Sequence, residues 1–256
     1  MAKYGMVIDL QKCVGCGACA LACKAENNTR GRADGQSYNW ADFIIKGDGT
    51  FPNLTHTTIP VLCNHCTNAP CVDNCPVSPT AMFKADDGTT LHNQERCIGC
   101  RSCQMACPYS AEELDEKSLS GETYSVISFN FEGKDTQPFW ADQAELIKGC
   151  TASALATAKG AGAPVPYMNS YESGDYKAIR RDGVVEKCIF CHHRITNGLE
   201  PACVVACPAK ARIFGDQQDL NSEIAQILKK EKAVRLKEEE GTEANVFYVR
   251  KFGPKA

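Results

Sequence analysis

The sequence lacks three features that would assign it to large classes of protein. None of its apolar runs approaches the roughly 18 residues that a membrane-spanning helix needs, so we expect no direct membrane span. The formal net charge is -3 and the pI is near 6.0, which gives no reason to expect nucleic-acid binding. The first ten residues show neither the apolar core nor the small-residue cleavage site of a signal peptide, so we expect no export signal in this chain.

Cysteine, by contrast, is abundant, with 17 residues in a chain of 256. The stretch from Cys97 to Pro108 reads C-I-G-C-R-S-C-Q-M-A-C-P, four thiols at gaps of two, two and three residues closed by a proline. This spacing is the signature of a bacterial ferredoxin loop that binds a 4Fe-4S cluster. The first three thiols converge on one cluster, while the fourth binds the other cluster of a pair. The sequence therefore predicts at least one further cysteine run.

Three further runs are present. The first repeats the two-two-three spacing but has Lys24 where the proline would stand, the second has two-four-three, and the fourth has two-eleven-three. Sixteen cysteines fall into the four quartets: Cys13, Cys16, Cys19 and Cys23; Cys63, Cys66, Cys71 and Cys75; Cys97, Cys100, Cys103 and Cys107; Cys188, Cys191, Cys203 and Cys207. Only Cys150 is left over, and we expect it to be a buried small apolar side chain and not a redox thiol. Metal ligation would supply much of the folding free energy.

Other uses of these cysteines are disfavoured by the spacing. Small disulfide-stapled domains do not repeat ferredoxin gaps. The string from Cys188 to His192 matches the C-x-x-C-H haem-attachment motif, but a haem would leave Cys203 and Cys207 without a role. A structural zinc site stays an alternative for the fourth quartet. Because the thiols already suffice for four cubes, we expect the five histidines to be non-ligands: His56, His65, His92, His192 and His193.

Several basic residues lie close to the motifs. We expect these to be mainly ordinary solvated surface, with local compensation of cluster charge and tuning of potentials as the alternative interpretation. They are Lys24, Arg101, Arg194, Lys210 and Arg212.

Hydrophobic periodicity gives a coarse map of the elements between the motifs. It predicts strands at residues 4–10, 58–62, 124–131, 213–216 and 246–252, and a hairpin over 80–92 that turns at Asp87-Gly88. It predicts a helix at 221–240 and one or two helical turns at 141–148. Residues 151–166, rich in Ala and Gly, are expected to be irregular. The long insert between the third and fourth quartets favours a partner-contacting lobe over a solvated insertion.

The order of the four quartets resembles one family, the four-cluster ferredoxin-like electron-transfer (beta or B) subunits of the molybdenum or tungsten bis-pyranopterin oxidoreductases, the dimethyl sulfoxide reductase superfamily. The likeness runs from M-V-I-D-L-Q-K-C through C-I-G-C-R-S-C-Q-M-A-C-P-Y to K-C-I-F-C-H-H-R, P-A-C-V-V-A-C-P and V-F-Y-V-R. Within it, the chain is most similar to the small subunits of respiratory arsenate reductase and polysulfide reductase. Lys24 departs from the pattern in a way that bears on loop shape and not on ligation.

The resemblance implies an α+β fold with two pseudo-symmetric dicluster ferredoxin-like units, an irregular insert and a C-terminal helix-strand extension. Residues 1–57 and 188–215 would form unit A around motifs 1 and 4, and residues 58–108 would form unit B around motifs 2 and 3. Residues 109–187 would be the partner-contacting insert, and residues 216–256 the extension.

The resemblance also implies four 4Fe-4S clusters and their ligands. Cluster 1 would be held by Cys13, Cys16, Cys19 and Cys207; cluster 2 by Cys188, Cys191, Cys203 and Cys23; cluster 3 by Cys63, Cys66, Cys71 and Cys107; cluster 4 by Cys97, Cys100, Cys103 and Cys75. Each iron would then have a protein ligand, so no catalytic residue is expected.

By the same resemblance, the chain would be a non-catalytic subunit of an anaerobic respiratory complex. It would relay single electrons between a large molybdopterin (Mo or W) catalytic subunit and a membrane quinone-interacting subunit or cytochrome c. Family members are often carried across the membrane with a signal-bearing partner, which implies the periplasmic face of the cytoplasmic membrane, with the cytoplasm as the alternative. The rival hypotheses are a free-standing soluble polyferredoxin, an enzyme acting at a three-cysteine cluster, and a zinc-stapled interaction module.

Overall fold

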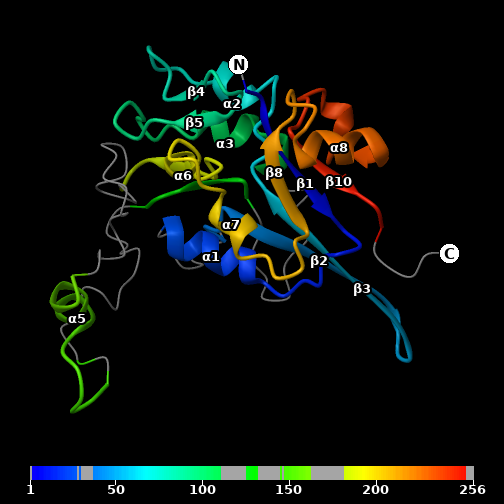
Figure 1. Cartoon of the computed structure of the whole chain (residues 1–256). Coiled ribbons are helices and arrows are strands. Elements are labelled where there is room, and N and C mark those ends of the chain that lie inside the picture. The colour runs from blue at the N-terminus through cyan, green and yellow to red at the C-terminus, as the bar shows by residue number, and fades with distance from the viewer. Residues whose placement is uncertain are drawn as a thin grey trace.

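The structure is a computed structural model that describes residues 2–27, 29, 37–110, 125–131, 145, 147–162 and 182–251. Its organising element is a four-stranded sheet in the order β8-β1-β10-β9 (Figure 1). The strands are β1 (Tyr4–Asp9), β8 (Arg212–Asp216), β9 (Ala233–Val234) and β10 (Val246–Val249). β1 runs parallel to β10 and antiparallel to β8, so a strand from the beginning of the chain lies between two strands from its last quarter.

The two faces of this sheet bury different neighbours. Along β1, Met6 and Ile8 join the main core, which also contains most of the cysteines, whereas Val7 faces a smaller cluster. That smaller cluster includes Ile224 of helix α8 (Glu223–Lys230), which packs on the outer face. The alternation follows from the two-residue period of a strand. One face of the sheet therefore supports the cysteine loops, and the other is closed by α8.

Short helices follow the cysteine loops in pairs. α1 (Ala18–Asn27) lies against α7 (Ala202–Val205), and α2 (Pro70–Asp73) lies against α3 (Ser102–Ala106). The first and fourth motifs therefore meet, and so do the second and third. The single-turn elements η1 (Pro108–Ser110), η4 (Glu238–Glu240) and α6 (His192–Ile195) fill the connections.

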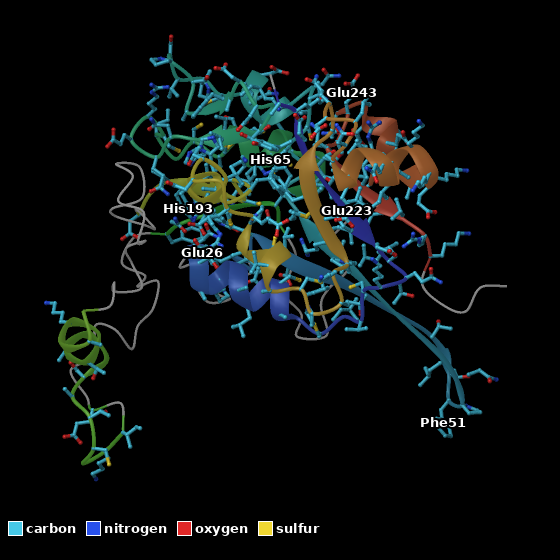
Figure 2. All side chains as sticks on the ribbon, viewed as in Figure 1. Glu26, Phe51, His65, His193, Glu223 and Glu243 are labelled. Carbon is cyan, nitrogen blue, oxygen red and sulfur yellow. The ribbon has the colours of Figure 1, made fainter. Side chains whose placement is uncertain are left out.

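Two hairpins and one further antiparallel strand pair complete the described part of the body. β4 (Met82–Lys84) pairs with β5 (Thr90–His92), which confirms the hairpin predicted over 80–92, with Gly88 at φ 79° in the turn. β6 (Ile127–Phe129) pairs with β7 (Val185–Lys187) and brings the two ends of the insert together. β2 (Ala41–Thr50) and β3 (Asn53–Leu62) form a long hairpin whose tip extends away from the body, with Phe51 at the end (Figure 2).

Two predictions of secondary structure are wrong in the described residues. The helix expected at 221–240 ends at Lys230, because Glu231 is extended and β9 then pairs with β10 at the sheet edge. Residues 151–166, expected to be irregular, contain α5 (Ala154–Gly160), an alanine-rich helix whose first turn is capped by the Ser153 side chain.

The helical turns predicted at 141–148 lie partly outside the described residues. In the described part, Glu145 forms an isolated β-bridge with Ser153 and residues 148–150 form a turn, so no helix is present there. Within the described part of the chain, no helix combines the length and apolar character needed to span a bilayer.

Candidate iron-sulfur centres

Two pockets are lined by cysteines from motifs that are far apart in the sequence. The first pocket, of ≈ 350 Å³, is lined by Cys13, Cys16 and Cys19 together with Cys207. The second, of ≈ 290 Å³, is lined by Cys97, Cys100 and Cys103 together with Cys75. In both, three thiols come from one loop and the fourth from the last cysteine of another motif. We call these the Cys13 group and the Cys97 group.

The other eight thiols form two more deeply buried groups. Burial raises the pKa of Cys23 well above its usual value, and the adjoining thiols Cys191, Cys188 and Cys203 raise it further. Burial likewise raises the pKa of Cys107 to about 12, with Cys63 and Cys71 next to it. Cys66 lies beside Cys63. The Cys188 group therefore contains Cys23, Cys188, Cys191 and Cys203, and the Cys63 group contains Cys63, Cys66, Cys71 and Cys107.

The four groups are arranged in series. Cys203 interacts electrostatically with Cys19, so the Cys188 group adjoins the Cys13 group. Cys188 interacts with Cys63, which joins the two inner groups. Cys103 interacts with Cys71, which joins the Cys63 group to the Cys97 group. The two outer groups each contain one exposed thiol, Cys16 and Cys100. The row of groups thus reaches solvent at both ends.

All four C-x-x-C turns share one backbone feature. The residue before the second cysteine has a positive φ: Gly15 66°, His65 43°, Gly99 69° and Phe190 52°. This conformation turns the backbone so that its amides face the thiols: the Gly99 and Phe190 amides donate to Cys97 Sγ and Cys188 Sγ, each at 3.4 Å. At Gly99 a side chain is also excluded by space, since a Cβ would lie 2.1 Å from the Gly183 carbonyl oxygen.

Further N–H groups donate to sulfur at the last cysteine of the motifs. The amides of Ala81 and Ala211 donate to Cys75 Sγ at 3.3 Å and Cys207 Sγ at 3.2 Å. Asn27 Nδ2 lies 3.5 Å from Cys23 Sγ and 3.8 Å from Cys191 Sγ. Such donors favour thiolate and tune an iron-sulfur cluster. Asn27 was missed in the sequence, although it stands one helical turn after Cys23 and so shares its face of α1.

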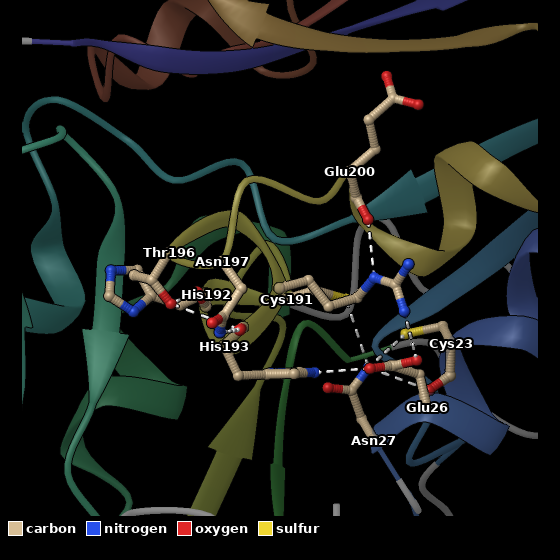
Figure 3. Close-up of polar contacts among 10 residues, drawn as sticks. Cys23, Glu26, Asn27, Cys191, His192, His193, Thr196, Asn197 and Glu200 are labelled. Atoms are coloured by element: carbon tan, nitrogen blue, oxygen red, sulfur yellow. Dashed lines mark hydrogen bonds and ion pairs between the residues drawn. The ribbon is translucent and has the colours of Figure 1, made fainter. Parts of the chain in front are cut away.

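A network of charged side chains connects α1 to the start of the fourth motif (Figure 3). Glu26 accepts from His193 Nε2 at 2.8 Å and from Arg194 Nη1 at 3.0 Å, and Arg194 Nε donates to the Glu200 carbonyl at 2.7 Å. Burial alone would raise the pKa of Glu26, but the His193 hydrogen bond and the Arg194 charge outweigh it and hold the pKa below its usual value. This network of side chains holds motif 1 against motif 4.

The basic residues near the motifs differ in their surroundings. Arg101 and Lys210 are exposed, as expected, and Arg101 lies over the Phe129 ring at 5.3 Å. Lys24 and Arg194 are half-buried. Arg212 is buried, with 3% of its surface exposed, so the expectation of solvated surface is wrong for this residue. Its place at the start of β8, beside Cys203 and Cys19, could not be read from a local pattern.

Three histidines have ring nitrogens engaged by protein groups. His65 Nδ1 accepts from the Thr90 amide at 3.1 Å, His193 Nε2 bonds to Glu26, and His192 Nε2 lies 3.5 Å from Asp87 Oδ2. His92 lines the Cys97 pocket. The side chain of His56 lies outside what the structure describes.

The prediction for Cys150 is wrong. Its side chain is exposed, in the turn at residues 148–150 that precedes α5. A cysteine is buried only where tertiary neighbours cover it, and the chain around this turn leaves it at the surface.

The donor sets fit a cube of iron and sulfide better than a single ion. In the described residues, no three His, Cys, Asp or Glu side chains converge to hold one metal ion. In the Cys13 and Cys97 groups the thiols instead surround a space, and backbone amides are directed at the sulfurs. Four thiolates around such a space, with N–H donors to the sulfurs, are the ligand set of a 4Fe-4S cluster.

Comparison with known proteins gives the class and the family. The model of a 4Fe-4S dicluster domain matches residues 54–123 and 145–217, and that of a 4Fe-4S binding domain matches residues 4–25. The chain is 46% identical to the arsenate respiratory reductase iron-sulfur subunit ArrB of Shewanella sp. (strain ANA-3), over 99% of this chain and 98% of that protein. It is 33% identical to the B subunit of selenate reductase from Mesobacillus selenatarsenatis and 32% identical to the B subunit of tetrathionate reductase from Salmonella typhimurium, each over 96% of this chain and 72% of the relative.

The fold and the cysteine groups therefore define a ferredoxin-like electron-transfer protein with four 4Fe-4S clusters. The chain belongs to the 4Fe-4S dicluster family of iron-sulfur B subunits of respiratory reductases in the dimethyl sulfoxide reductase superfamily. It is an electron-transfer subunit and not a catalytic one, and it works with a catalytic partner.

Proposed function

We propose that single electrons cross this subunit through four clusters in the order Cys13 group, Cys188 group, Cys63 group, Cys97 group. The proposed ligands of each cluster are the four cysteines of its group. The observation that carries the proposal is the series arrangement, in which Cys203 adjoins Cys19, Cys188 adjoins Cys63 and Cys103 adjoins Cys71. Electron transfer needs no open iron site, and the protein sets each potential through charge, hydrogen bonds to sulfur and solvent access.

We further propose that the chain is built from two dicluster units whose halves interlock. Unit A would comprise residues 1–57 and 188–215, unit B residues 58–108, with residues 109–187 as a partner-contacting insert and 216–256 as an extension. The packing of α1 on α7 and of α2 on α3 supports this division. So does the pairing of β6 with β7, which closes the base of the insert.

We propose a molybdenum or tungsten bis-pyranopterin subunit as the catalytic partner, and a membrane quinone-interacting subunit or a cytochrome c as the other electron partner. The names of the relatives support a reductase of an oxyanion such as arsenate, selenate or tetrathionate. We propose the periplasmic face of the cytoplasmic membrane as the location, with export alongside the partner.

The test is anaerobic purification of the complex from cells that express it. We expect a large pterin-containing subunit to co-purify, about sixteen irons in this chain, four per cube, and four reducible 4Fe-4S signals by EPR. A stable monomer that carries the same iron and binds no large subunit would instead support a free polyferredoxin. Zinc in any of the four groups would contradict the ligand assignment.

A further inference from the structure

Arg212 is a buried cation placed between two cysteine groups. It is the first residue of β8 and lines the Cys13 pocket. The groups that interact most strongly with its guanidinium electrostatically are the thiols Cys203 and Cys19, which belong to the second and first groups. It therefore stands where these two groups adjoin.

The polar atoms of Arg212 are not satisfied by ordinary partners. Nη1 is 3.7 Å from Met6 Sδ, a weak acceptor, and within the described residues Nε and Nη2 make no hydrogen bond of regular geometry. The other acceptors within reach of the guanidinium are the sulfurs of Cys19 and Cys203. A buried guanidinium without a carboxylate is costly, because its lost hydration is not replaced. Among the described residues, the groups with the largest favourable electrostatic effect on it are the cysteine thiolates, and with them the clusters they would hold. The side chain is therefore directed toward negative charge at the metal centres.

The Cys97 pocket provides an internal comparison. There the Ala81 amide donates to Cys75 Sγ as the Ala211 amide donates to Cys207 Sγ, and a strand begins at the next residue in both places. That next residue is Arg212 in one pocket and Met82 in the other, and both are buried. Each pocket also has one exposed thiol, Cys16 or Cys100, so solvent reaches both. The two pockets thus differ at one matched position by a buried positive charge.

The charge of a cluster in its two redox states decides whether the buried cation raises or lowers its reduction potential. Reduction adds one electron to a cluster and makes it one unit more negative, while the arginine stays charged in both states and no proton is required. A nearby buried cation interacts more strongly with the more negative state, because screening by water is weak there. The cation therefore favours the reduced form.

We propose that Arg212 is a positioning charge that raises the reduction potentials of the two clusters it adjoins, those of the Cys13 and Cys188 groups. The inference rests on the proposed ligand assignment. Arg212 would keep the reduction potentials of the first two clusters of the electron path higher than they would be without it. The matched residue in the other half of the path is the apolar Met82.

The experiment is an EPR-monitored redox titration of the intact anaerobic complex with Arg212→Met, which copies the matched residue of the other pocket. We expect two of the four midpoint potentials to fall. At a fixed applied potential the ratio of reduced to oxidised cluster should drop at least tenfold at each, which is about 59 mV for a one-electron couple. The other two potentials should stay where they are in the unchanged protein.

Three further variants make the result decisive. Arg212→Lys keeps the charge and should restore both potentials, and Arg212→Gln keeps polarity without charge and should behave as Arg212→Met. Cys150→Ser changes an exposed thiol that belongs to no group and should leave all four potentials unchanged. Iron content is measured on each variant, so a failed ligand assignment would be seen as a wrong iron count and not as an absent shift. Unchanged potentials in Arg212→Met with full iron content would overturn the proposal. So would loss of a cluster in both neutral variants, because the role would then be assembly.

Discussion

The imidazole of His65 stacks on the phenyl ring of Phe190, with ring centroids 3.6 Å apart and an interplanar angle of 16°. Each residue occupies the same place in its own C-x-x-C turn, and each has a positive φ. The outer motifs have glycine at this place. The stack lies where the Cys63 group meets the Cys188 group, so the two halves of the electron path are joined through a contact between two cluster loops.

His65 should make stability depend on pH. Burial, together with the charges of Lys187 and Lys84, holds the pKa of His65 well below its usual value. Below about pH 6.5 the unfolded chain takes up a proton that the folded chain cannot bind, so the free energy of unfolding should fall by about 1.4 kcal/mol per pH unit. His65→Gln should lack this slope. Denaturant unfolding of both proteins under anaerobic conditions at about pH 7.5 and about pH 5.5 measures the difference. Parallel pH dependence in the two would contradict it.

A cysteine variant should show that a cluster takes its fourth ligand from another motif. Cys207→Ser should damage the cluster held mainly by the N-terminal loop, because Cys207 lines the pocket of Cys13, Cys16 and Cys19. We expect iron to fall by up to about four atoms, with one EPR signal lost or changed. Cys150→Ser is the matched control, since this exposed thiol belongs to no group, and it should keep full iron. A loss confined to the cluster of Cys188 would argue against the assignment.

Asn27 should tune the cluster of the Cys188 group. Asn27→Leu removes the N–H donor near Cys23 Sγ and Cys191 Sγ. The reduced cluster is the better acceptor, so its potential should fall by about 20 to 40 mV if the bond favours that form by about 0.5 to 1 kcal/mol. EPR redox titration gives the shift. Asn197→Ala is the control, because its side chain donates to the His193 carbonyl and not to sulfur. An equal shift in both variants would point to loosening of the loop.

Ser222 should contribute to stability through the cap of α8. Its hydroxyl oxygen accepts from the Ala225 amide at 3.2 Å and its O–H donates to the Asp216 carbonyl at 2.6 Å. Ser222→Ala should lower the free energy of unfolding by about 1 to 2 kcal/mol. Ser222→Asp keeps the acceptor and should recover part of that loss. Denaturant midpoints of the holo-protein provide the comparison, with cluster absorption as a check on iron content. No change in Ser222→Ala would show that the cap is dispensable.

Local sequence signals predicted a good part of the secondary structure. Residues 4–10 and 213–216 were recognised as strands, since each carries a strand's own pattern of apolar residues. The helix predicted over 221–240 was too long, because a charged, helix-favouring segment was recruited to the edge of the sheet as β9. Capping by Ser153 and an alanine-rich composition favour α5, and both signals are present in the sequence of this segment.

The sequence by itself determined the chemistry of this protein. The gaps between sixteen cysteines identify ferredoxin loops, and the glycines at 15 and 99 mark two of their turns, because thiol spacing and backbone freedom are local properties. Only the tertiary structure decided the environment of that chemistry. It placed Cys207 beside Cys13, stacked His65 on Phe190, buried Arg212 and exposed Cys150. Burial, and with it the strength of a charge, depends on which distant segments pack together, and no local pattern in the chain records that.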